Sequence, residues 1–159
     1  MNHQSRVWVY QSNRVLSAEE TETINNALIN FIKSWTAHNQ QLKAAFEIKY
    51  HRFLVLIVDE TQAGASGCSI DKSVHLMKEL QQQFHIDLFD RFNIAYKLDE
   101  EVKSAPKEAF EELIKTGAIN ANTIVFNNLV PDYGQYLEKW EVPLKDSWHA
   151  KVFKLESVL

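Results

Sequence analysis

The chain has 159 residues and a formal net charge of −4, and 45% of its residues are hydrophobic, which suits one domain spanning residues 1–159. The acidic balance offers no general attraction to the phosphates of nucleic acid or of anionic lipid, so neither nucleic acid nor a membrane is an expected partner. Its one cysteine, Cys68, excludes an internal disulfide, and the N-terminus lacks the apolar core of a signal peptide, so we expect a cytoplasmic protein.

The first part of the chain predicts a strand, a helix, two strands, a helix and a strand, in that order. Residues 6–11 are β-branched and aromatic, as in a strand, and Ser17 and Glu20 match a capping box before a helical stripe from Ile24 to Trp35. The remaining elements are an alternating strand at 42–50, a uniformly apolar strand at 53–58, a helix with an apolar stripe at 70–84 and a strand at 92–98.

This order is the split βαβ pattern, so we expect an α+β fold with a ferredoxin-like (βαββαβ) core over residues 1–99. We expect the first and third strands to be central and parallel, so that the loops after them, 11–16 and 59–69, leave the sheet at the same end. Residues 100–159 form a C-terminal extension. It should contain a helix opened by Ser104 and Pro106 and ended by Gly117, a strand at 123–127, and an irregular tail that covers the bare face of the sheet.

Five stretches of the chain are similar to a family of small bacterial proteins. They are RVWVYQSNR (6–14), SGCSIDKSV (66–74), DLFDRFNIAY (87–96), TIVFNNLV (123–130) and VPLKDSWHAKVF (142–153). Members of that family commonly carry the label "ABC transporter ATPase". Such an ATPase needs a Gly-rich loop that ends in Gly-Lys-Ser/Thr, which wraps the phosphates and holds magnesium. No Gly-Lys pair occurs anywhere in this chain, so we exclude ATP hydrolysis. The resemblance therefore implies a shared fold and no particular activity.

The loop GASGCSIDKS, from Gly64 to Ser73, is the leading candidate site. Glycines let backbone amides turn inward, and the start of a helix favours an anion. We therefore expect a non-catalytic protein that binds a small anionic ligand or a protein partner at this loop. The residues expected to contact it are Arg14, Ser66, Gly67, Cys68 and Ser69. The alternative is purely structural, with Ser69 capping the helix and Asp71 complementing its dipole.

A second interpretation makes the protein a cysteine-dependent enzyme. The helix start would favour a reactive thiolate at Cys68, with His149 as its base and Asp146 orienting the histidine. Helix-start amides would then stabilise an oxyanion. The opposing interpretation is that Cys68 is a small, buried and unreactive packing residue. Geometry separates the two, because the enzyme needs His149 within about 4 Å of the Cys68 sulfur.

Asn127 and Asn128 place two amides side by side at the end of the strand at 123–127. We expect these two side chains either to bind a ligand or to hold backbone groups of the tail. The six histidines have no metal-ligand spacing with one another or with Cys68, so we expect no metal site. The sequence also shows no motif for a cofactor.

Overall fold

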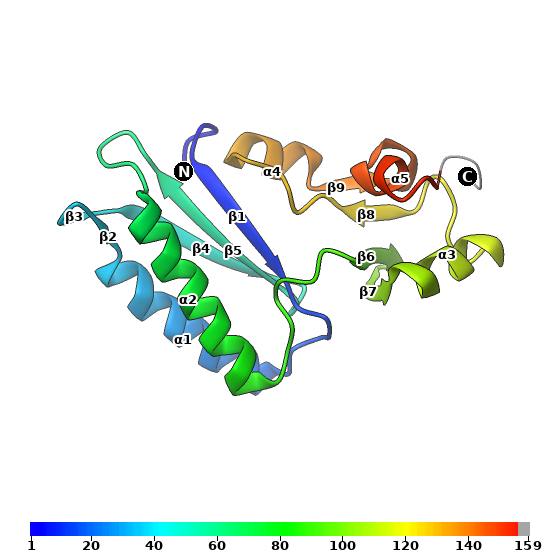
Figure 1. Ribbon diagram of the computed structural model, residues 1–159, viewed down its shortest axis with the longest axis horizontal. Coiled ribbons are helices and arrows are strands. Elements are labelled where there is room, and N and C mark those ends of the chain that lie inside the picture. The colour runs from blue at the N-terminus through cyan, green and yellow to red at the C-terminus, as the bar shows by residue number, and fades with distance from the viewer. Residues whose placement is uncertain (156–159) are drawn as a thin grey trace.

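The computed structural model describes residues 1–155 as two β-sheets and a short hairpin with helices packed around them (Figure 1). In chain order the first elements are β1 (Arg6–Gln11), α1 (Ala18–Ser34), β2 (Thr36–Ala37), β3 (Gln40–Gln41), β4 (Lys43–Lys49), β5 (Phe53–Asp59) and α2 (Gly67–Phe84). They are followed by β6 (Asn93–Leu98), β7 (Glu101–Pro106), α3 (Lys107–Lys115), β8 (Ile124–Phe126), α4 (Tyr133–Lys139), β9 (Glu141–Pro143), the 3-10 helix η1 (Leu144–Asp146) and α5 (Trp148–Val152). The expected α+β class is confirmed. None of the helices within residues 1–155 is both long enough and apolar enough to cross a membrane.

The first sheet has the strand order β1-β5-β4, and α1 and α2 cover one of its faces. Every residue of β5 is buried, in accordance with its apolar sequence and its central place. The predicted capping box begins α1: Glu20 N donates to Ser17 Oγ (3.0 Å), and Ser17 N donates to the Glu20 carboxylate (2.9 Å). The apolar stripes of the two helices face the sheet and bury Leu28 and Met77 completely.

β1 and β5 run antiparallel, so the expectation of parallel strands is wrong. Arg6 faces Val58 and Gln11 faces Phe53 in the register of this pair. The reason is the connection between the strands. α1 returns the chain so that β4 runs parallel to β1, and the tight turn after Lys49 then reverses β5. The loop after β1 and the loop after β5 therefore leave the sheet at opposite ends.

The strand predicted at 92–98 does not join this sheet. It forms β6, which pairs with β7 and β8 in a second sheet of order β7-β6-β8-β9. The first sheet therefore lacks the fourth strand of a ferredoxin-like core. β7 had no counterpart among the predicted elements, because the hairpin before it contains no glycine. Its two turn residues, Asp99 and Glu100, instead adopt positive φ angles of 52° and 68°.

The chain after β6 covers the other face of the first sheet, as predicted for the C-terminal extension. Trp140 packs edge-on against Phe53, with ring centroids 4.9 Å apart, and the Phe126 ring lies 4.7 Å from the Phe53 ring. Val130 and Tyr136 belong to the same buried cluster. The tail is more regular than expected, since it forms α4, β9, η1 and α5. Each of these elements has only three to seven residues, which is too short for a periodic pattern.

The predicted third helix is present as α3, which begins after Pro106 and buries Phe110 and Ile114. Gly117 follows its end with a φ of 81°, a conformation that glycine adopts without strain. Ser104 was expected to open this helix but lies in β7, where the chain is still extended. The predicted strand at 123–127 is confirmed as β8.

Candidate functional site

The start of α2 is closed by its own side chains. Ser66, and not Ser69, is the N-cap residue: Ser69 N donates to Ser66 Oγ (3.2 Å), and Ser66 N donates to Ser69 Oγ (2.7 Å). Ser69 is thus the third residue of the helix. It is buried, and its carbonyl accepts a hydrogen bond from the Trp35 indole N–H (2.8 Å). This reciprocal capping box uses the backbone N–H groups of Ser66 and Ser69, which the sequence had suggested as donors to a ligand.

A carboxylate already occupies the Gly64–Ser73 loop. Glu60 Oε2 accepts a hydrogen bond from Ala65 N (2.8 Å). The same oxygen would be 3.1 Å from a β-carbon placed on Gly64, so the carboxylate lies directly against the loop backbone. A fixed negative charge at this point repels a second anion. The geometry of the loop therefore does not favour the anionic ligand expected there.

Cys68 is exposed, so its interpretation as a buried packing residue is wrong. It lines an open cavity of about 500 Å³, together with His38 and Lys72. The structure does not bring Cys68 to His149. α2 lies over one face of the first sheet, whereas α5, which carries His149, packs with the second sheet on the other side (Figure 1). Asp146 is exposed in η1. The expected set of Cys68, His149 and Asp146 is therefore not assembled.

Arg14 lies at the far end of α2 from Cys68. Its guanidinium donates to the carbonyl of Phe84, the last residue of the helix (2.7 Å), and to both carboxylate oxygens of Glu20 (2.9 and 2.7 Å). These hydrogen bonds lower the pKa of Glu20 to about 2. The 18 residues of α2 give it a length of about 27 Å at ~1.5 Å per residue. Arg14 is thus about one helix length from the loop it was expected to join, because β1 and β5 are antiparallel.

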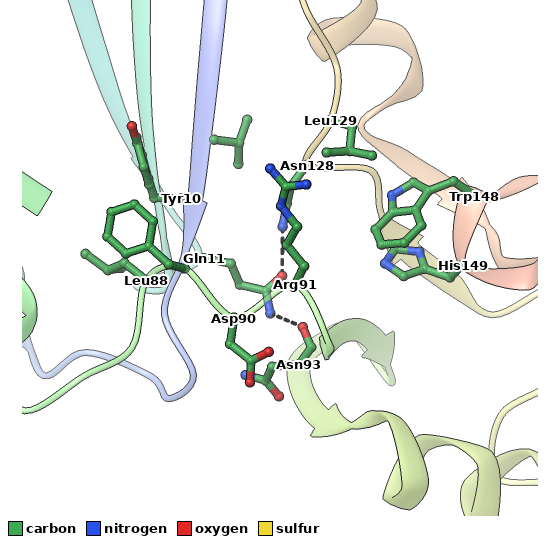
Figure 2. A pocket seen from close by; sticks show the side chains of 12 residues that line it. Tyr10, Gln11, Leu88, Asp90, Arg91, Asn93, Asn128, Leu129, Trp148 and His149 are labelled. Atoms are coloured by element: carbon green, nitrogen blue, oxygen red, sulfur yellow. Dashed lines mark hydrogen bonds between the residues drawn. The ribbon is translucent and has the colours of Figure 1, made fainter. Parts of the chain in front are cut away.

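A smaller cavity, of about 150 Å³, lies where the end of β1 meets the second sheet, and we call it the β1 cavity (Figure 2). Five parts of the chain line it: β1, the segment before β6, the first residue of β6, the segment after β8, and α5. Two residues that the sequence assigned to different sites, Asn128 and His149, meet here. The other lining residues used below are Val9, Gln11, Phe89, Arg91, Asn93, Leu129 and Trp148.

A chain of hydrogen-bonded amides forms one wall of the β1 cavity. Gln11 Nε2 donates to the Asn93 carbonyl (2.8 Å), and Asn128 Nδ2 donates to Gln11 Oε1 (2.9 Å), as Figure 2 shows. Asn128 Oδ1 in turn accepts from the Trp140 indole N–H (2.9 Å). Each amide is therefore fixed in orientation by its neighbours. The network ties β1 of the first sheet to β6 and to the C-terminal part of the chain.

Asn127 holds backbone groups of the tail, which is one of the two roles expected for it. Its side-chain oxygen accepts a hydrogen bond from Leu129 N (3.0 Å), and its own N–H donates to the Trp140 carbonyl (2.6 Å). These bonds hold backbone groups of the tail. Asn127 does not line the β1 cavity, whereas its neighbour Asn128 does.

Trp148 and His149 form the opposite wall and leave two buried nitrogens unsatisfied. Their rings are stacked, with centroids 3.9 Å apart and an interplanar angle of 27°. His149 is 4% exposed, and this burial lowers its pKa to about 4, so the imidazole is neutral at pH 7. Trp148 Nε1 and His149 Nδ1 are both buried, and neither has a hydrogen-bond partner within residues 1–155. Figure 2 places both rings across the cavity from Gln11.

Arg91 is the cation of the β1 cavity. Its side chain is exposed and forms no ion pair with any carboxylate in the described part of the chain. Figure 2 shows it extending towards Asn128 and Leu129. Neither Arg91 nor Gln11 was expected from the sequence to be a site residue. Both lie in stretches, 87–96 and 6–14, on which the expected family resemblance rested, and no other sequence pattern marks them.

The β1 cavity is lined by amide, indole, imidazole and guanidinium groups, together with the Tyr10 phenol and one carboxylate, that of Asp90, which precedes Arg91 in the chain. Across residues 1–155, no three His, Cys, Asp or Glu side chains gather closely enough to hold a metal ion. Comparisons with protein-family models, with curated proteins and with solved structures find no match for this chain.

Proposed function

We propose that this protein is a non-catalytic binding protein and that the β1 cavity holds a carboxylate group of its ligand. The observation that carries the proposal is the pair of unpaired buried nitrogens, Trp148 Nε1 and His149 Nδ1, at one cavity. A buried polar group without a partner costs about 1–3 kcal/mol. Both nitrogens are buried beneath the cavity surface in this structure, so a ligand oxygen that reaches them, after a shift of the rings, removes that cost and favours binding.

The type of hydrogen-bonding group supports a carboxylate in particular. An indole N–H and a guanidinium can only donate, and a neutral imidazole can carry its proton on Nδ1. The lining of the cavity therefore includes one exposed donor, Arg91, and two buried donors, Trp148 and His149. An ionised carboxylate only accepts hydrogen bonds, and its negative charge complements the unpaired charge of Arg91.

The size and the apolar part of the cavity support a small ligand group. A volume of about 150 Å³ equals the space of about five water molecules at roughly 30 Å³ each. Val9, Phe89 and Leu129 supply apolar surface beside the polar groups. A carboxylate with a short aliphatic chain matches both features. The ligand is thus an anion, as expected from the sequence, but its site is the β1 cavity and not the Gly64–Ser73 loop.

The lining of the cavity favours binding over catalysis. It contains no cysteine, serine or lysine to act as a nucleophile, and all of its members lie within the described range. Four of the five stretches that are similar to the bacterial family contribute residues to this one cavity, which supports it as the shared site. We also propose that the protein is cytoplasmic, as expected from its composition.

The test is a titration of ¹⁵N-labelled protein with sodium butanoate, in which the indole N–H signals of its four tryptophans are followed by NMR. Trp148→Phe identifies the Trp148 signal by its loss. We expect that signal to shift saturably with butanoate and not with butanamide, which has the same shape without the charge. Arg91→Gln should weaken binding about tenfold or more, since it removes a charged donor.

Lys72→Gln is the matched control, because it removes a positive charge from the Cys68 cavity instead. It should leave the affinity for butanoate unchanged. If the Trp148 signal does not respond to butanoate, the proposed function is wrong. If binding is seen but is weakened by Lys72→Gln and not by Arg91→Gln, the site is the Gly64–Ser73 loop after all.

A further inference from the structure

A buried positive charge without a counter-ion lies behind the wall of the β1 cavity. Resting on the function proposed above, we infer that Arg52 makes this cavity specific for an ionised group, because its uncompensated charge attracts an anion without touching it. The ligand class is thereby narrowed to groups that are fully ionised at neutral pH, and neutral acceptors such as amides and esters are rejected.

The first observation is the burial of Arg52 without a carboxylate. The residue is 5% exposed, and an arginine side chain stays protonated in proteins. Among the described residues it forms no ion pair. Burial lowers the pKa of Arg52, and the one charge interaction that acts on this pKa is with the Tyr96 phenol. Because a buried charge is costly unless it is paired, an anion that arrives nearby is favoured.

The second observation is that the guanidinium has only neutral hydrogen-bond partners. Nη1 donates to the Ser104 hydroxyl (2.7 Å) and to the Ser12 carbonyl (3.3 Å). Nε is buried and has no hydrogen-bond partner within residues 1–155. Two neutral acceptors do not cancel a full charge, so Arg52 leaves a positive potential in its surroundings.

The third observation is the position of the guanidinium beside the β1 cavity. Asn93, which lines the cavity, donates from Nδ2 to the same Ser104 hydroxyl that Arg52 uses (3.3 Å). Ser12, the other acceptor of Arg52, directly follows Gln11 of the amide wall. Arg52 therefore lies one side chain behind the wall of the cavity and is not itself part of the lining.

Arg52 and Arg91 act on the ligand in different ways. Arg91 is exposed, so salt screens its attraction, whereas a buried charge such as that of Arg52 is screened much less. At an effective dielectric constant of about 20, a unit charge about 10 Å from an anion changes the affinity about tenfold. A neutral ligand gains nothing comparable. The buried arginine thus supplies a preference for an ionised group that high salt does not remove.

The test measures butanoate binding, by the NMR signal of the Trp148 indole, in two variants of Arg52. Arg52→Gln removes the charge and should weaken binding about tenfold, to a similar extent at low and at high sodium chloride concentration. Arg52→Lys keeps the charge but loses the planar guanidinium, and it should bind butanoate within about threefold of the wild type. Arg6→Gln is the matched control, since it removes an arginine that is 43% exposed and paired with Glu60 at the other end of β1. It should leave the affinity unchanged.

The wild-type chain supplies a readout that does not depend on the folding of a variant. In the ¹⁵N-labelled protein, the Arg52 Nε–H signal is the arginine signal that exchanges most slowly with solvent, because the other three arginines are more exposed. We expect this signal to shift with butanoate along the same saturation curve as the Trp148 signal. If Arg52→Gln does not fold, this titration decides the question.

The outcomes separate this inference from the function on which it rests. If butanoate shifts the Trp148 signal but not the Arg52 Nε–H signal, or if Arg52→Gln binds butanoate as tightly as the wild type, the role of Arg52 is wrong and the carboxylate site stands. If folded Arg52→Lys loses as much affinity as Arg52→Gln, the shape of Arg52 matters and its charge does not, and the inference is again wrong. If butanoate does not shift the Trp148 signal of the wild-type chain, both proposals fail.

Discussion

The pH dependence of stability tests the buried state of His149. Its side chain is 4% exposed, and this burial lowers its pKa from 6.5 to about 4. In the unfolded chain the imidazole returns to its ordinary pKa, so between pH 6.5 and pH 4 the unfolded state binds a proton that the folded state does not. The stability associated with the neutral ring is therefore present above pH 6.5 and is lost as the pH falls towards 4.

The size of this effect follows from the two pKa values. A pKa lowered from 6.5 to about 4 corresponds to at most about 3 kcal/mol, at ~1.36 kcal/mol for each pH unit. Between pH 7 and pH 5 the expected loss is about 2 kcal/mol, because the folded protein is still mostly unprotonated at His149 at pH 5. Glu20 and Asp59, whose pKa values are lowered to about 2, contribute mainly below this interval.

Urea unfolding at pH 7 and pH 5, followed by circular dichroism, measures the loss in the wild-type chain and in His149→Gln. Over this interval we expect the variant to lose about 2 kcal/mol less than the wild type, whatever its stability at pH 7. His75→Gln is the control, because the His75 side chain is 75% exposed, and it should keep the wild-type dependence. Equal losses in His149→Gln and in the wild type would refute the reasoning.

Three further substitutions test other parts of the structure by urea unfolding. Glu100→Gly should stabilise the protein by about 0.5–1 kcal/mol, because a left-handed φ of 68° strains any residue but glycine; a loss of stability would contradict the turn geometry. Asn128→Ala should cost about 1–3 kcal/mol, since it leaves the Trp140 indole N–H without its acceptor, and a neutral result would mean that the amide network is not stabilising. Cys68→Ser should change stability by less than about 0.5 kcal/mol, and the Cys68 thiol should be alkylated in the native protein; protection of the thiol until unfolding would contradict its exposure.

The elements that depend on neighbouring residues were predictable. Ser17 and Glu20 form the expected capping box, and the apolar run at 53–58 is the central buried strand β5. The capping box depends only on residues close together in the chain, and the central strand is recognised by its uniformly apolar composition. The same local rule failed at the start of α2, where three serines lie close together and Ser66 takes the position expected of Ser69. Both residues fit the pattern, and only the place where the helix begins decides between them.

The candidate site was predictable only in pieces. Asn128 and His149 were named from the sequence, but for different sites, and Gln11 and Arg91 were not named at all. A glutamine or an arginine carries no signal of its own, because these residues are common on protein surfaces. Each becomes significant through its surroundings. Gln11 is hydrogen-bonded to Asn93 and Asn128, and Arg91 lines the β1 cavity without forming an ion pair in the described part of the chain.

The sequence by itself determined the α+β class, most of the helices and strands, the start of α1 and the absence of an ATPase phosphate loop. The tertiary structure decided that β5 runs against β1, that β6 joins a second sheet, and that Cys68 and His149 lie on opposite sides of the first sheet. The physical reason is that a strand has hydrogen-bonding groups on two edges, and its side-chain pattern shows which face is buried but not which strand pairs with either edge. That choice depends on connections and packing between distant parts of the chain, and here it built the cavity beside β1.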